Sequence, residues 1–116
     1  MAVKKGESKI YNLNHTLIAE IIKDERFQRT IDAEFIEEAI TPQKHEFRFI
    51  RKTTAARYGR NIFISINDAG NNSTTVNATV QSRKITVLID TSWKKEVERI
   101  FSALDILTEL AMAKSE

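Results

Sequence analysis

A basic segment in the middle of the chain is the sequence feature best suited to binding chemistry. Residues 44–60 contain six basic residues and one acidic residue, and they include Tyr58. The basic residues are Lys44, Arg48, Arg51, Lys52, Arg57 and Arg60. Such side chains bind phosphate at loose spacing, and the Tyr58 ring can stack on a base. The segment is therefore a candidate for nucleic acid or an anionic surface. The alternative is a solvated strand face and turn, which the low net charge of +2 and the absence of a nucleic-acid motif favour.

Residues that commonly serve catalysis are few in this chain. There is no cysteine, which excludes thiolate zinc sites and a cysteine nucleophile. His15 and His45 are the only histidines, and neither has a histidine three or four residues further on. We interpret His15 as a first-turn helix residue and His45 as an exposed strand start. Neither a nucleophile motif nor a phosphate-binding loop is present. We therefore expect no catalytic residue, no cofactor and no metal site, and we assign no enzyme activity.

Length and composition suit one domain in the cytoplasm. The chain has 116 residues, of which 41% are hydrophobic, enough for a core. Its basic start leads into no apolar segment of the kind found in signal peptides, and no apolar run reaches the roughly 18 residues of a membrane span. We expect a flexible terminus over residues 1–8 and a single domain over residues 9–116.

The first third of the sequence is predicted to be helical. Leu17, Ile18, Ile21 and Ile22 form one stripe at helical spacing, which predicts a helix over residues 15–26. Residues 30–41 have two interpretations. As a helix ending before Pro42, they would carry one apolar stripe; as a strand, they would pair with the next segment through the turn "TPQK". We favour the helix, because alanine and glutamate are poor strand formers.

From His45 onward the apolar residues alternate with polar ones, as in antiparallel strands with one face on the core and the other exposed to solvent. The expected strands are "HEFRFIRKTTA", "NIFISIN", "TTVNATVQ" and "ITVLID". Asp90, Thr91 and Ser92 can then cap a helix. After them, apolar residues recur at steps of three and four and fall within roughly 120° on a helical wheel. They are Trp93, Val97, Ile100, Phe101, Leu104, Leu107 and Ala111.

This last helix has to lie across the sheet to bury its apolar stripe. We expect Trp93 to be buried at the N-terminal end of the helix. Ile106 and Leu110 point away from the stripe. Either the N-terminal helices cover them or a second subunit does, and we expect a subunit interface.

Between sheet and helix, aromatic side chains are candidates to line a pocket for an apolar ligand. They are Phe47, Phe49, Phe63, Trp93 and Phe101. The alternative is a filled core, which we favour because a cavity costs stability that a small domain can hardly spare.

The order of elements resembles that of the helix-grip proteins of the Bet v 1 type, and also one half of a TATA-binding-protein-like fold. The stretch "STTVNATVQSRKITVLIDTSWKKEVERIFSAL" is similar to the tails of small uncharacterised bacterial proteins, although Thr91 and Ser92 separate Asp90 from Trp93 here. The resemblance covers the last half of the chain and brings no catalytic motif. It implies a fold class and no substrate.

The sequence thus predicts an α+β fold. It has a mainly antiparallel sheet of four or five strands, with two N-terminal helices and a long C-terminal helix packed on one face. The expected function is that of a small non-enzymatic cytosolic binding domain, self-associated as a homodimer. One alternative is a helix-grip carrier of an apolar small molecule. The other is a nucleic-acid or anionic-surface binder that uses the basic segment.

Overall fold

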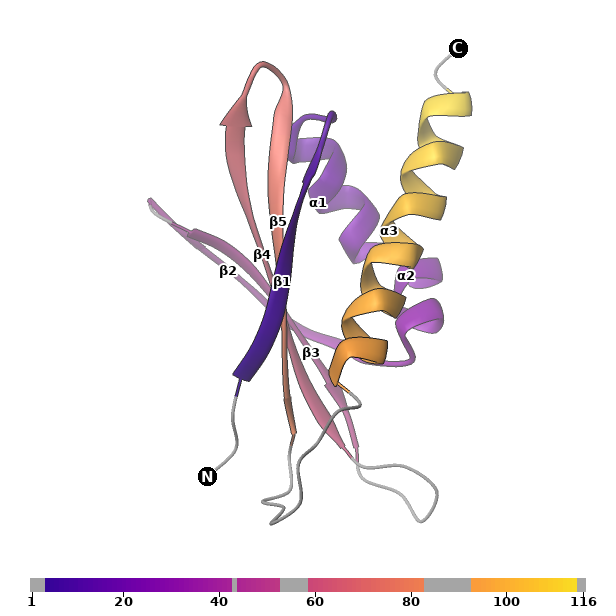
Figure 1. Cartoon of the computed structure of the whole chain (residues 1–116). Helices are drawn as coiled ribbons and strands as arrows, with labels where there is room; N and C mark the ends of the chain where they lie inside the picture. Colours follow the sequence, from indigo (N-terminus) through magenta and orange to yellow (C-terminus); the bar gives the residue numbers. More distant parts are fainter. Residues whose placement is uncertain (1–3, 43, 53–58, 83–92, 115–116) are drawn as a thin grey trace.

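An antiparallel sheet forms one layer of the fold (Figure 1). The computed structural model describes residues 4–42, 44–52, 59–82 and 93–114. Within them the sheet has five strands in the order β1-β5-β4-β3-β2, each antiparallel to its neighbours. The strands are β1 (Lys4–Tyr11), β2 (Glu34–Thr41), β3 (Lys44–Arg51), β4 (Arg60–Gly70) and β5 (Ser73–Ser82).

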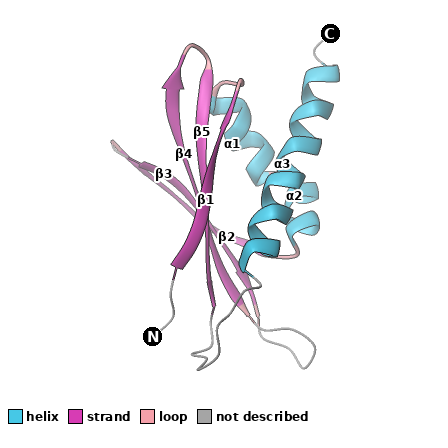
Figure 2. Ribbon diagram, in the orientation of Figure 1, coloured by secondary structure: helices cyan, strands magenta, loops and turns pink. Residues whose placement is uncertain are grey.

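Helices α1 (His15–Lys23), α2 (Glu25–Ile31) and α3 (Trp93–Lys114) lie on one face of this twisted sheet (Figure 2). The α+β class, the mainly antiparallel sheet and the long C-terminal helix are as predicted. Two N-terminal helices are also present, but they occupy His15–Lys23 and Glu25–Ile31 and not residues 15–26 and 30–41. Among the described residues, no helix is long and apolar enough to cross a membrane.

Local capping explains where the two N-terminal helices begin and end. The Asn14 side chain accepts a hydrogen bond from the Leu17 amide at 2.9 Å and starts α1. Asp24 has extended backbone angles, which end α1, and its side chain accepts from the Arg26 amide at 2.8 Å to start α2. The helix predicted over residues 15–26 is therefore broken at Asp24.

Residues 34–41 form strand β2, so the helix that we favoured there is wrong. Asp32 ends α2 in the left-handed region, at φ 55°. The following residues pair with β3, with Thr41 opposite Lys44, as in the alternative interpretation. Phe35 packs against the rings of Phe47 and Phe49. Strand pairing and aromatic packing outweigh the helical propensity of alanine and glutamate, which tertiary contacts often override.

Strand β1 starts earlier than expected. Residues 4–8, which we expected to be flexible, pair with β5 from Lys4 opposite Gln81 onward. Gly6 allows this pairing, because a Cβ atom there would lie 2.1 Å from the Ala78 carbonyl oxygen. The predicted strand "ITVLID" and the cap at residues 90–92 lie outside the described residues.

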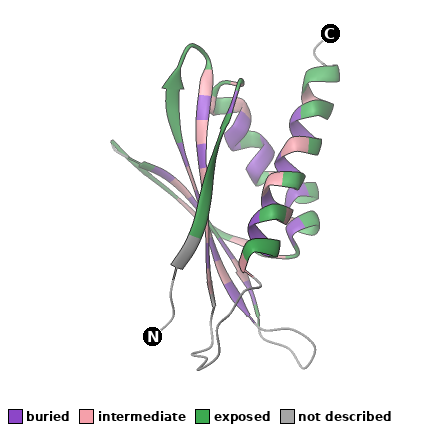
Figure 3. Cartoon of the chain, viewed as in Figure 1, coloured by how far each residue is buried: buried purple, intermediate pink, exposed green. Residues whose placement is uncertain are grey.

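The core lies between the sheet and the three helices (Figure 3). Its sheet side alternates buried and less buried positions, as predicted from the period of two. The buried sheet residues are Phe47, Phe49, Ile62, Ile64, Ile66, Val76, Ala78 and Val80. Buried residues of the helices include Ile18, Ile22, Phe27, Ile31, Val97, Ile100 and Leu104.

Candidate functional site

The aromatic residues predicted to line a pocket lie in three different environments. Phe47 and Phe49 are 0% and 1% exposed and belong to the buried core between the sheet and the helices. Phe49 packs against Phe27 with ring centroids 5.8 Å apart. Phe63 lies on the opposite face of the sheet, because Ile62 and Ile64 take the inward positions of β4. There the Arg48 guanidinium lies 5.1 Å from the centre of its ring.

Trp93 and Phe101 are the two predicted pocket residues that lie at the border of the core. Both are on α3, and both are half-buried and packed against the core cluster. Trp93 is thus less buried than predicted, and the Lys94 ammonium lies 5.8 Å from the centre of its ring.

A groove of about 410 Å³ runs between α3 and the edge strand β1, with Phe101 as its aromatic residue. It is lined by Glu7, Ser8 and Lys9 of β1 and by Glu98, Phe101, Ser102 and Asp105 of α3. The two elements lie side by side along this line (Figure 1). The groove therefore gives solvent access to the border between helix and sheet.

A polar cluster at this groove joins β1 to α3. The Lys9 ammonium lies 2.9 Å from one Asp105 carboxylate oxygen and 3.0 Å from the other. The Tyr11 hydroxyl donates to Asp105 at 2.8 Å. Burial, followed by the hydrogen bond to Asp105 and its charge, raises the pKa of Tyr11 well above its usual value of 10.0. The tyrosine therefore stays protonated and keeps donating to Asp105.

Arg51, predicted in the basic segment as a surface residue, is instead buried. It is 9% exposed and forms a paired, two-point contact with Glu96, which is 8% exposed; both N···O distances are 2.8 Å. Arg51 also donates to the carbonyl oxygens of Ile31 and Asp32 at 2.8 Å each. This arginine joins the end of β3 to α2 and to the first turns of α3.

The charges around Glu96 keep it ionised. Burial by itself raises the pKa of Glu96, but the hydrogen bonds and charge of Arg51, with the charges of Arg99 and Arg60, outweigh it. The pKa of Glu96 therefore lies below its usual value. The Glu96 hydrogen bonds in turn raise the pKa of Arg51.

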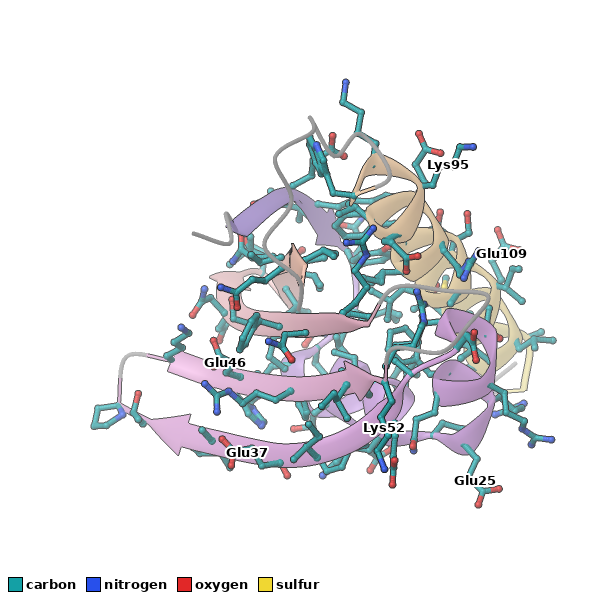
Figure 4. All side chains as sticks on the ribbon, turned by 90° about the horizontal axis from the view of Figure 1, so that it is seen from below. Glu25, Glu37, Glu46, Lys52, Lys95 and Glu109 are labelled. Atoms are coloured by element: carbon teal, nitrogen blue, oxygen red, sulfur yellow. The ribbon has the colours of Figure 1, made fainter. Side chains whose placement is uncertain are left out.

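The other described basic residues do not form one positive surface. The Lys44 ammonium lies 2.7 Å from a Glu46 carboxylate oxygen, and the Arg48 guanidinium lies 3.0 Å from a Glu37 carboxylate oxygen. Figure 4 shows these two glutamates on the neighbouring strands β3 and β2, and Lys52 further along, past the end of β3. Arg60 is buried. Arg57 and Tyr58 lie outside the described residues.

The two histidines, 30 residues apart in sequence, are in contact. His15 Nε2 lies 2.9 Å from His45 Nδ1, and His45 Nε2 lies 2.5 Å from Glu38 Oε2. The hydrogen bond with His45, followed by the charges of Lys23 and His45, lowers the pKa of Glu38 despite some burial. His45 is buried, not exposed as predicted. Sequence reasoning missed this cluster because it placed Glu38 on a helix; the strand interpretation would have put Glu38 beside His45 on a hairpin.

The predicted interface residues Ile106 and Leu110 are on the solvent side of α3. They are 56% and 46% exposed. The N-terminal helices therefore leave these residues uncovered.

Comparison with solved structures, and not with sequences, identifies the fold of this chain. No protein-family model matches the sequence, and no curated protein matches it significantly. Solved structures match over nearly the whole chain. One is Ara h 8.0201, at 9% identity and a TM-score of 0.56, which covers 90% of this chain and 95% of that one.

Two further matches have similar extent. A START superfamily protein from Mycobacterium smegmatis is 12% identical, has a TM-score of 0.50 and covers 99% of both chains. The ginseng major latex-like protein 151 from Panax ginseng is 8% identical, has a TM-score of 0.51 and covers 91% of this chain and 97% of that one. These neighbours are Bet v 1-like and START superfamily proteins, so the helix-grip resemblance is confirmed as a statement about fold.

Proposed function

We propose that this protein is a helix-grip carrier that binds an apolar small molecule between α3 and the sheet. The observation that carries the proposal is the groove of about 410 Å³ where α3 meets β1, in a fold shared with Bet v 1-like and START proteins. Its volume lies within the roughly 300–1,000 Å³ that is usual for small-molecule sites. The carrier was the alternative in the sequence analysis, and it now replaces the unspecified interaction domain as our preferred function.

The chemistry of the groove defines the class of ligand. Phe101 is half-buried and offers an apolar surface at the border of the core. Around it lie the Lys9 ammonium, the Ser102 hydroxyl and three carboxylates, those of Glu7, Glu98 and Asp105. The ligand is therefore an apolar molecule with a polar group at one end: its chain packs on Phe101 and its polar end faces Lys9 and Ser102.

Phe101→Arg is expected to weaken binding of dodecanoate by on the order of 10- to 100-fold, because an apolar contact worth about 1.5–3 kcal/mol is lost. Displacement of the fluorescent probe anilinonaphthalene sulfonate measures the affinity. Ala113→Arg is the matched control, since it adds the same charge to an exposed position of α3. Equal affinity in both variants, or no binding by the unchanged protein, would contradict the proposal.

We also propose that the protein self-associates through the solvent side of α3. Exposed apolar side chains at Ile106 and Leu110, one helical turn apart on α3, support this. The double change Ile106→Glu with Leu110→Glu is expected to convert a dimer to a folded monomer, because both residues point to solvent within one chain. Sedimentation and circular dichroism report the two properties. Wild-type protein that sediments as a monomer at high concentration rules the dimer out.

A cytoplasmic location completes the proposal, supported by a sequence without cysteine, which suits a reducing compartment. No enzymatic step is proposed. Nucleic-acid binding has less support than before, because Arg51 and Arg60 are buried and Lys44 and Arg48 face carboxylates.

A further inference from the structure

The contact between His15 and His45 is not used by the proposed carrier function. His15 belongs to the first turn of α1 and His45 to β3, so two separate elements bring their imidazoles together. His15 Nε2 lies 2.9 Å from His45 Nδ1, and the other ring nitrogen of His45 lies 2.5 Å from Glu38 Oε2. The three side chains therefore connect α1 through β3 to β2 by two consecutive hydrogen bonds.

Only one proton fits between the two rings. Two ring nitrogens at hydrogen-bond distance need one N–H group and one lone pair. The Glu38 carboxyl group is ionised, because its hydrogen bond with His45 lowers its pKa, and an ionised carboxylate only accepts. His45 therefore carries its proton on Nε2, toward Glu38, and its Nδ1 accepts the Nε2 proton of His15. In this arrangement both rings are neutral.

The pair can take up one further proton without a change of contacts, but not two. The first enters at His15 Nδ1, and the His15 ring still donates from Nε2 to His45. The second has only His45 Nδ1 left to bind, where it meets the N–H group of His15 across 2.9 Å. Because two N–H groups cannot point at each other over this distance, the second proton requires the rings to separate.

The charged groups that face the two rings come from α1, β2, β3 and β4. The Lys23 ammonium of α1 lies 3.5 Å from Glu38 of β2. Lys44 of β3 and Asp68 of β4 line the recess of about 270 Å³ that opens beside the histidines, and Lys44 lies 2.7 Å from Glu46. These three carboxylates and two ammonium groups leave one negative charge. It balances one imidazolium and not two, so the second proton also lacks electrostatic compensation.

We propose that the contact of His15 with His45 is a pH-sensitive switch between α1 and the β2–β3 hairpin, which opens when both rings are protonated. His45 is 9% exposed and packs against Phe47 with ring centroids 4.6 Å apart, whereas His15 is half-buried. The part that moves is therefore His15 with the first turn of α1. Because His15 lines the recess, its departure widens this space.

Urea unfolding of the full chain and of His15→Gln, from about pH 7.5 to about pH 5, tests the switch. A glutamine amide donates to a neutral imidazole and accepts from a protonated one, so this variant keeps a contact without the conflict. In an unfolded chain each histidine is protonated below roughly pH 6.5, whereas the folded pair takes up one proton. The unfolding equilibrium constant should therefore rise, as the pH falls, by up to about tenfold per pH unit more in the unchanged protein than in the variant.

Thr16→Gln is the matched control, since it places the same side chain at the neighbouring, exposed position of α1. It removes no titrating group and should keep the pH dependence of the unchanged protein. An equal pH dependence in the unchanged protein and in His15→Gln would overturn the proposal.

Nitrogen-15 NMR of the histidine rings in the unchanged full chain is a second measurement, which needs no variant. The chain has two histidines. One ring is expected to become protonated while the backbone amide shifts of α1 stay constant, and the second only together with shifts at the start of α1. Protonation of both rings without such amide shifts would contradict the switch. None of these results bears on dodecanoate binding at the α3–β1 groove.

Discussion

Replacing Arg51 with methionine is expected to lower the free energy of unfolding by about 3–5 kcal/mol, which is typical for breaking a buried ion pair. The change leaves the Glu96 carboxylate buried without its partner, and it takes the donor from the Ile31 and Asp32 carbonyl oxygens. Urea unfolding followed by circular dichroism measures the loss. The double variant Arg51→Met with Glu96→Leu should recover much of it, because no uncompensated charge remains.

The same pair predicts how the effect depends on pH. The pKa of Glu96 is lowered in the folded protein, from an ordinary value of 4.5. The contribution of ionised Glu96 to the free energy of unfolding is therefore complete above the ordinary pKa of 4.5. It is lost as the pH falls through the lower pKa of the folded state. The difference in stability between wild type and Arg51→Met should then shrink in acid. A variant with wild-type stability at neutral pH would show that the contact does not hold α3 to the sheet.

The second large effect is expected for Phe49→Ala, with a loss of about 3–5 kcal/mol in the free energy of unfolding. Phe49 is 1% exposed and packs against the rings of Phe27 and Phe35, so truncation removes these contacts and leaves a cavity in the core. Chemical denaturation measures the change.

Phe101→Ala is the informative comparison for that measurement. Phe101 is half-buried at the groove, so its truncation should cost less, on the order of 1 kcal/mol. If Phe49→Ala cost no more than Phe101→Ala, Phe49 would line an open space, and the ligand site would have to be placed deeper than we propose.

The periodicity of the sequence predicted most of the fold. Alternation along residues 45–50, 61–66 and 75–80 placed Phe47, Ile64 and Val76 on the buried face, as observed. The same alternation argues against Phe63 as a pocket residue, since its neighbours Ile62 and Ile64 already point inward. That prediction failed because aromatic character was given more weight than position.

The failures elsewhere have a common physical cause, which is tertiary pairing. Residues 34–41 have helical composition but become an edge strand, because β3 offers both backbone partners and Phe47 and Phe49 to cover Phe35. Arg51 looked like one of several surface cations, because its partner Glu96 lies 45 residues further along the chain. No local spacing reveals such a pair, nor the contact of His15 with His45.

The central claim is that an apolar molecule binds between α3 and the sheet at the groove beside Phe101. Backbone amide chemical shifts of isotope-labelled protein, recorded as dodecanoate is added, test this claim most directly. Our account predicts saturable shifts along Ser8–Lys9 of β1 and Phe101–Asp105 of α3, with little change around Ile106 and Leu110 on the solvent side. An unchanged spectrum, or shifts confined to that solvent side, would contradict it.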